Sequence, residues 1–218
     1  MYENRKAKNQ QPELKKPKKQ TMKKYQLIIC ILLFGYCTNI NAQFSPLIPI
    51  DFVVPESKEN EHFRLRMLTV NDVVKDYDAV MSSSKELQEM FPTWAGWPKD
   101  LTLEQDLIDL GWHQAEFQMR SSFTYTVVSL DESEVIGCVY ILPFYMSDFD
   151  IGTPKKNNGN FDAVIYMWVR TSLLEEGMDN LLFDTVKKWM NTEWPFKNVA
   201  YPGREISWDK WATLKKDD

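Results

Sequence analysis

The pattern of apolar and polar residues divides the chain into a series of strands and helices. Short runs rich in β-branched and aromatic residues predict strands at 63–68, 123–128, 135–142, 163–169 and 198–201. The polar stretch 131–134 separates the second run from the third, and this spacing predicts a β-hairpin.

Apolar residues at helical spacing predict three helices between these strands. The first begins at Asn71 or Asp72, and the residues on its apolar face are Val74, Tyr77 and Met81. The second begins with a capping box of Thr102 and Gln105, and its apolar residues are Leu103, Leu107, Leu110 and Phe117. The third spans 174–190, and its inward residues are Met178, Leu182, Val186 and Trp189. The predicted order is therefore β-α-α-β-β-β-α-β.

The junction between the strand at 163–169 and the helix after it has the form of an anion-binding turn. A helix N-terminus that follows a strand presents free N–H groups and the positive end of the helix dipole. Gly177 lies at this junction, and a glycine there allows a pyrophosphate to approach the backbone closely.

This strand, turn and helix resemble the acetyl-CoA-binding segment of the GNAT (Gcn5-related) N-acetyltransferases. In that family a Gln/Arg-x-x-Gly-x-Gly/Ala loop wraps the CoA pyrophosphate. Leu174 falls at the Gln/Arg position, Gly177 at the first glycine and Asp179 at the second small residue. The resemblance implies an α/β (α+β) domain with a mixed, mostly antiparallel sheet flanked by helices, shortened at its C-terminus. It also implies acetyl-CoA as cofactor, with contacts from Met167, Trp168, Val169, Leu174, Gly177, Met178, Asp179 and Asn180.

Two of the three motif positions depart from the family pattern. Leu174 supplies no side-chain donor, and the carboxylate of Asp179 would lie against a diphosphate and repel it. The alternative is that Asp179 is an ordinary acidic residue in the first turn of a helix, where it stabilises the helix by roughly 0.3–1 kcal/mol.

Several aromatic residues fall where the resemblance places the meeting point of acyl donor and amine acceptor. Tyrosine can serve as the acid that protonates a departing thiolate, so the candidate catalytic residues are Tyr166 and Tyr201. The candidate substrate-binding residues are Trp94, Trp97 and Arg204. Two plainer interpretations stay open: most of the aromatic residues form core, and Arg204 bonds carbonyls of the turn at 202–203.

The N-terminal 42 residues differ from the rest of the chain. They contain a basic stretch, an apolar run at 25–37 and a small residue at Ala42, which together are typical of a signal peptide with Met22 as a possible true start. An uncleaved anchor is the alternative, and it would be the only route to a membrane. We therefore predict a signal region at 1–42, a linker at 43–61, a GNAT-like domain at 62–211 and a tail at 212–218, with export if the signal is functional.

Charge and composition limit the possible partners. Residues 43–218 contain 17 Lys and Arg against 29 Asp and Glu, a net charge of 17 − 29 = −12, and therefore lack the basic face that nucleic acid requires. His113 and Glu116 have a metal-ligand spacing without an evident third ligand, so no metal site is predicted. Cys138 is expected to be a buried structural thiol.

Three functions are consistent with these features. The first is an N-acetyltransferase that transfers an acyl group from acetyl-CoA to a small-molecule amine or peptide. The second is an exported, non-catalytic GNAT-fold domain that binds a ligand or a protein. The third is a structural envelope protein. Fold alone does not choose among them.

Overall fold

A computed structural model describes residues 46–94, 96–147 and 156–215. The predicted signal peptide and its cleavage site lie outside the described residues. In the part of the chain that is described, no helix is long and apolar enough to cross a membrane.

A six-stranded sheet forms the centre of the domain, with its strands in sequence order across the sheet. The strands are β1 (Ser57–Glu59), β2 (Arg64–Met67), β3 (Phe123–Val128), β4 (Val135–Leu142), β5 (Ala163–Val169) and β6 (Val199–Ala200). Neighbouring strands are antiparallel except for β5 and β6, which are parallel. The predicted mixed, mostly antiparallel sheet and the predicted hairpin between β3 and β4 are therefore confirmed.

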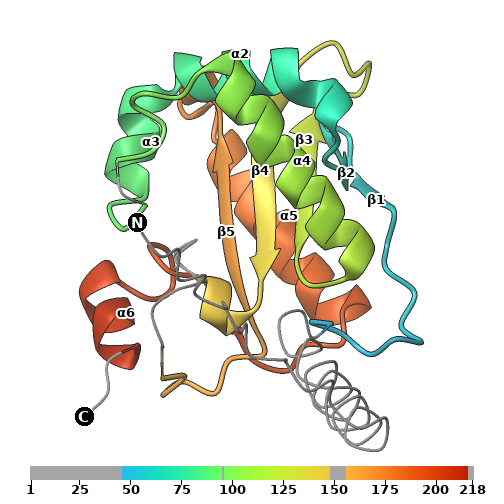
Figure 1. Ribbon diagram of the computed structural model, residues 1–218, viewed down its shortest axis with the longest axis vertical. Coiled ribbons are helices and arrows are strands. Elements are labelled where there is room, and N and C mark those ends of the chain that lie inside the picture. Colours follow the sequence, from blue (N-terminus) through green and yellow to red (C-terminus); the bar gives the residue numbers. More distant parts are fainter. Residues whose placement is uncertain (1–45, 95, 148–155, 216–218) are drawn as a thin grey trace, which may run out of the picture. The chain divides into compact units, whose positions relative to one another are not determined.

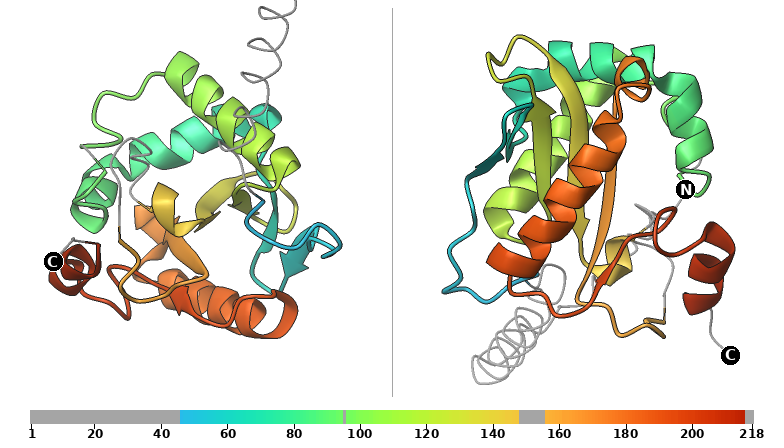
Figure 2. Two further views of the ribbon diagram at one scale, coloured as in Figure 1. Left: turned by 60° about the horizontal axis from the view of Figure 1, so that its bottom comes forward. Right: turned by 180° about the vertical axis from the view of Figure 1, so that it is seen from behind.

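Five helices are described, and they cover both faces of the sheet (Figures 1 and 2). They are α2 (Val73–Ser82), α3 (Ser84–Met90), α4 (Leu103–Met119), α5 (Met178–Glu193) and α6 (Trp208–Leu214). In Figure 1, α4 lies in front of β3 and β4, and α5 lies behind the sheet.

The face of the sheet toward α5 holds one of two apolar cores. Alternate residues of β5 point into it, namely Ile165, Met167 and Val169, as the strand pattern predicts. Three residues of α5 are fully buried against them at the predicted helical spacing: Leu182, Val186 and Trp189. The predicted packing of this helix is confirmed, although α5 begins at Met178 rather than at Leu174, because Gly177 just before it has a left-handed backbone that does not continue a helix.

The second core lies on the opposite face, where α2, α3 and α6 contribute side chains. Here the predicted faces of two helices are partly wrong. Val74 is 68% exposed because α2 turns Asp76, Ala79 and Val80 inward instead. On α4, Leu103 and Leu107 are 45% and 44% exposed, and Asp106 and Leu110 are the buried residues.

Two elements, β1 and α3, were not anticipated from the pattern. The predicted linker 43–61 contributes β1 to the sheet and the buried side chain of Ile48 to the core. A further short helix, α3, follows α2 directly. After β6 the described chain has only an isolated bridge and α6, which extends past Trp211 into the predicted tail and agrees with a shortened C-terminus.

Candidate functional site

The candidate site is the place where β5 and β6 separate. Pairing between these strands is limited to Ala163 with Val199 and Val164 with Ala200. Beyond Ala200 the chain turns away from β5 through Pro202 and Gly203. Residues 165–169 of β5 therefore do not pair with β6, and a gap lies beside them. The turn requires glycine, since Gly203 has φ +76° and a Cβ there would lie 2.9 Å from the ring of Trp208.

The N-terminus of α5 opens onto the same gap. Gly177 precedes the helix in the left-handed conformation at φ +75°, and a Cβ at this position would meet no atom within 4 Å. Its N–H donates to the carbonyl of Leu174 at 3.1 Å, and the side chain of Leu174 packs against the core. The N–H groups of 178–180 precede the helix's own hydrogen-bond ladder, whose first bond runs from Leu181 to Gly177.

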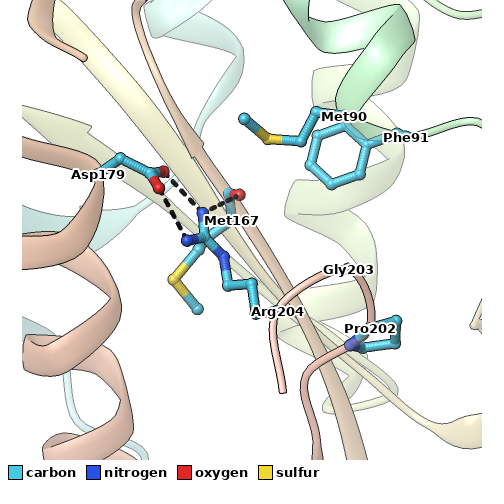
Figure 3. Close-up of a pocket in the computed structure, with 7 residues that line it drawn as sticks. All are labelled: Met90, Phe91, Met167, Asp179, Pro202, Gly203 and Arg204. Carbon is cyan, nitrogen blue, oxygen red and sulfur yellow. Dashed lines mark hydrogen bonds and ion pairs between the residues drawn. The ribbon is translucent and has the colours of Figure 1, made fainter. Parts of the chain in front are cut away.

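An ion pair bridges the gap (Figure 3). Nη1 and Nη2 of Arg204 donate to the two carboxylate oxygens of Asp179 at 2.8 and 2.7 Å. Nη2 also donates to the carbonyl oxygen of Met167 at 3.3 Å, and the guanidinium lies 5.3 Å from the ring centroid of Phe183. A bidentate arginine–carboxylate pair is among the stronger charge-assisted contacts in proteins. We call this arrangement of Arg204, Asp179 and the Met167 carbonyl the clasp.

A pocket of about 130 Å³ remains beside the clasp. Its lining residues come from α3, β5, α5 and the turn after β6, and they are Met90, Phe91, Met167, Asp179, Pro202, Gly203 and Arg204. Figure 3 shows Met90 and Phe91 across the pocket from the guanidinium. The walls are thus mostly apolar, and the polar groups are already paired with each other.

The structure brings part of the predicted cofactor site together. Met167, Asp179 and Arg204 converge on the clasp, although Arg204 was predicted as a substrate-binding residue. The side chains of Trp168 and Val169 point to opposite faces of the sheet. Asn180 is exposed at the start of α5, and Met178 is half-buried against the core.

The two candidate catalytic tyrosines do not meet. Tyr166 lies in the core on the α2 side, where its hydroxyl donates to the carbonyl of Ser147. Tyr201 lies in the core on the α5 side, and its buried hydroxyl has no hydrogen-bond partner among the described residues. Burial raises the pKa of Tyr201, with a smaller contribution from the nearby Glu205. The sheet therefore separates the two phenols.

Trp94 and Trp97 belong to an aromatic cluster on the α2 side. The ring of Trp94 stacks on Phe91 with 4.0 Å between centroids and meets Tyr166 edge-on at 5.2 Å. Trp97 lies 5.4 Å from Trp94 and is half-buried. The structure thus places Trp94 in the core, while Trp97 keeps partial access to solvent.

The pattern did not reveal a group of buried polar residues between α2, α4 and the sheet. Asp76 and Asp106 are 5% and 4% exposed. Burial, together with the neighbouring carboxylates Asp106 and Asp72, raises the pKa of Asp76 to about 8. Burial and Asp109 raise the pKa of Asp106 to about 7. The sequence did contain a signal for this group, because Asp72 and Asp76 are four residues apart and therefore lie on one face of a helix. The prediction overlooked it because it placed the face with Val74 against the core.

His113 and Glu116 lie on the same side of the sheet. Nδ1 of His113 is 3.2 Å from the hydroxyl of Thr124 and 3.6 Å from a carboxylate oxygen of Glu116. The described residues contain no group of three metal-ligating side chains that could hold an ion.

Comparisons with known proteins agree with the topology. No family model and no curated protein matches the chain. A ribosomal-protein-S5-alanine acetyltransferase from Vibrio fischeri matches in structure with 18% identity and a TM-score of 0.50, covering 72% of this chain and 79% of that one.

Two further matches are more distant. The microcin C7 self-immunity acetyltransferase, solved with acetyl-CoA and AMP, has 10% identity and a TM-score of 0.45, and the match covers 64% of this chain and 69% of that one. A ribosomal L7/L12 α-N-protein acetyltransferase has 15% identity and a TM-score of 0.44, with 66% and 67% covered. The strand order and the likeness to the Vibrio fischeri structure indicate a GNAT fold, and at 18% identity the likeness is one of fold alone.

The residues at the gap do not fit the pyrophosphate of acetyl-CoA. The carboxylate of Asp179 lies at the helix start where an anion would bind, and Leu174 contributes no donor. The carbonyl of Met167, a residue that the resemblance places in contact with acetyl-CoA, already accepts a hydrogen bond from Arg204.

Proposed function

We propose that this protein is a GNAT-fold binding domain in which an internal ion pair takes the place of the acyl cofactor. The observation that supports the proposal is the clasp. Arg204 pairs with both oxygens of Asp179 and with the carbonyl of Met167, so it joins the turn after β6 to the first turn of α5 and to β5. For acetyl-CoA to enter, the clasp would have to open and its carboxylate would then face a diphosphate.

The pocket beside the clasp is the place where we expect a ligand. Its walls include Met90, Phe91 and Pro202, and its polar groups are Asp179 and Arg204. Pockets that enclose a drug-sized ligand measure ~300–1,000 Å³, so this pocket of about 130 Å³ would hold only a small part of a ligand. A small molecule or a peptide is the expected partner class. With a charge of −12 on residues 43–218, nucleic acid is not expected.

Titration calorimetry with acetyl-CoA tests the proposal. We expect the unmodified protein to bind with a dissociation constant above ~1 mM, which corresponds to a binding free energy weaker than about −4 kcal/mol. The double variant Leu174→Arg with Asp179→Gly should bind more tightly, because it adds a donor, removes the repelling carboxylate and releases Arg204 toward the phosphates.

A matched control separates this local effect from net charge. Glu175 and Glu176 are exposed in the same turn, and Glu175→Gln with Glu176→Gln raises the net charge by the same two units. Improvement in the first variant alone supports the proposal. Tight binding by the unmodified protein would refute it.

Acetyl transfer is the second candidate, and one observation favours it. β5 separates from β6 beside the N-terminus of α5, which follows the left-handed Gly177, and such an N-terminus could bind an anion if the clasp opened. Release of free thiol from acetyl-CoA in the presence of amines, above the rate of hydrolysis without protein, would establish this function in place of binding.

Export is the second part of the proposal. The basic stretch before residue 25, the apolar run at 25–37 and the Ala42–Gln43 junction support a cleaved signal peptide. N-terminal sequencing of the native protein should begin at Gln43. A chain that retains residues 22–42 in the soluble cytosolic fraction would contradict export.

A further inference from the structure

The outer face of α4 carries an apolar stripe that no described element covers. Ile108, Trp112 and Met119 are 47%, 61% and 42% exposed. Together with the half-buried Ala115 they stand at positions i, i+4, i+7 and i+11, which align on one side of a helix. Figure 1 shows α4 on the outside of the domain, in front of β3 and β4.

This stripe is not a consequence of how α4 packs inward. The buried face of the helix is formed by other residues, Asp106 and Leu110, and Phe117 packs against the core. A helix at the surface of a soluble domain normally carries polar residues on its outer face. A tryptophan with more than half of its surface exposed at the centre of an apolar stripe is typical of an interaction site, since tryptophan is enriched among binding hot spots.

The charged residues of α4 itself are all acidic. None of the 17 residues of α4 is Lys or Arg. The acidic residues Glu104 and Asp109 lie on either side of the line from Ile108 to Met119, because they project about 40° and 100° from Ile108 on a helix of 3.6 residues per turn. A partner that covers this face would therefore be apolar at its centre and positively charged at its edges.

We propose that the face of α4 defined by Ile108, Trp112, Ala115 and Met119 is a docking surface for a basic amphipathic helix of another protein. The spacing of the four residues matches the ridge that one helix presents to another. Burial of the Trp112 ring supplies the main apolar contact, and Glu104 and Asp109 select a cationic partner. A second copy of the chain fits less well, since two such faces would bring acidic residues together without a basic one from α4 itself.

Two synthetic peptides of 18 residues test this surface on the full chain. One is an amphipathic helix of Leu and Lys, and the other has every Lys replaced by Glu. We expect the Leu–Lys peptide to bind in a fluorescence polarisation assay and the Leu–Glu peptide to bind at least tenfold more weakly.

Variants locate the binding. Trp112→Ser and Ile108→Ser should each weaken binding of the Leu–Lys peptide tenfold or more, with melting curves close to that of the unmodified protein because both side chains are exposed. Leu130→Ser removes an exposed apolar residue from the turn between β3 and β4 and should change the affinity by less than twofold.

Three results would overturn the proposal. One is equal binding of the Leu–Lys peptide by the protein and by Trp112→Ser, which would mean that charge alone holds it. Another is equal binding of the two peptides. The third is self-association in analytical ultracentrifugation that Trp112→Ser abolishes, since a second copy would then be the occupant. All three are independent of whether acetyl-CoA binds at the clasp.

Discussion

Replacing Asp76 by Asn should make the protein more stable and remove much of the dependence of its stability on pH. Asp76 lies on the inward face of α2 and is 5% exposed, and among the described residues it forms no ion pair. Burial is the main cause of its raised pKa, about 8. The charged and titratable groups that face it are Asp72, Asp106 and Arg170, with Cys138 and Tyr140 on the sheet below.

The sign of the effect follows from proton binding. The unfolded chain loses the Asp76 proton near its ordinary value of 3.8, whereas the folded protein keeps this proton until the pH reaches its raised pKa of about 8. The contribution of Asp76 to stability is therefore fully present below pH 3.8 and is lost as the pH rises through about 8. At 1.36 kcal/mol per pH unit, the free energy of unfolding should fall by roughly 4 kcal/mol between pH 5 and pH 8 because of this group.

Asp106 acts in the same direction with a smaller shift, since its pKa is raised to about 7. Surface carboxylates with lowered pKa values, such as Asp131 at about 2, change the stability in the opposite direction, since their contribution is lost as the pH falls. This change takes place below pH 5 and so does not affect the comparison between pH 5 and pH 8. Asp76→Asn keeps the shape of the side chain and removes its titration. The variant should be more stable than the unmodified protein at pH 8 and should differ less from it at pH 5.

Urea unfolding followed by circular dichroism at both pH values measures the difference. The matched control is Asp184→Asn, because Asp184 is exposed on α5, away from the buried pair. Histidines and all other groups cancel when variant and unmodified protein are compared. If both proteins lose the same stability between pH 5 and pH 8, Asp76 titrates normally and the argument from its burial is wrong.

Three further substitutions test the fold itself, each by chemical denaturation. Trp189→Ala should lower the free energy of unfolding by about 3–5 kcal/mol, since Trp189 is fully buried and meets Tyr125 edge-on at 5.0 Å; a loss below about 1 kcal/mol would contradict the placement of α5. Gly137→Ala should cost ~1–3 kcal/mol, because a Cβ there would lie 2.1 Å from the carbonyl oxygen of Trp168, and an unchanged stability would mean that the strands are further apart. Thr102→Ala should cost about 1 kcal/mol by removing the bond from the N–H of Gln105 at 3.2 Å, and no loss would mean that the cap is replaced by water.

The strands and the packing of α5 were predictable because their signals are local. Alternation along 163–169 sends Tyr166 and Trp168 to one face and Met167 to the other, and the structure has this arrangement. The periodicity of Leu182, Val186 and Trp189 likewise requires only the geometry of a helix. Each of these patterns lies within the strand or helix that it predicts, so it can be recognised without knowing which other elements pack against it.

The inward faces of α2 and α4 were harder to predict because both contain carboxylates. A pattern that sorts residues by polarity assigns Asp76 and Asp106 to the surface and Val74 and Leu107 to the core. The structure reverses these assignments, and it does so at an energetic cost that appears as the raised pKa of both aspartates. Buried ionisable groups of this kind are common at functional positions, where sequence pattern and structure are expected to disagree.

The clasp could not be predicted because its two halves lie 25 residues apart and only one belongs to the motif. In the sequence, Asp179 departs from the pattern of an anion-binding turn, and Arg204 is a candidate substrate-binding residue outside that motif. In the structure each accounts for the other, since the guanidinium supplies a positive charge at the helix start and the carboxylate supplies the anion that the helix dipole favours. The carboxylate that departs from the cofactor motif and the guanidinium of Arg204 therefore have one structural explanation. The N-terminus of α5 still has an anion beside it, but this anion is the side chain of Asp179 in the first turn of the helix.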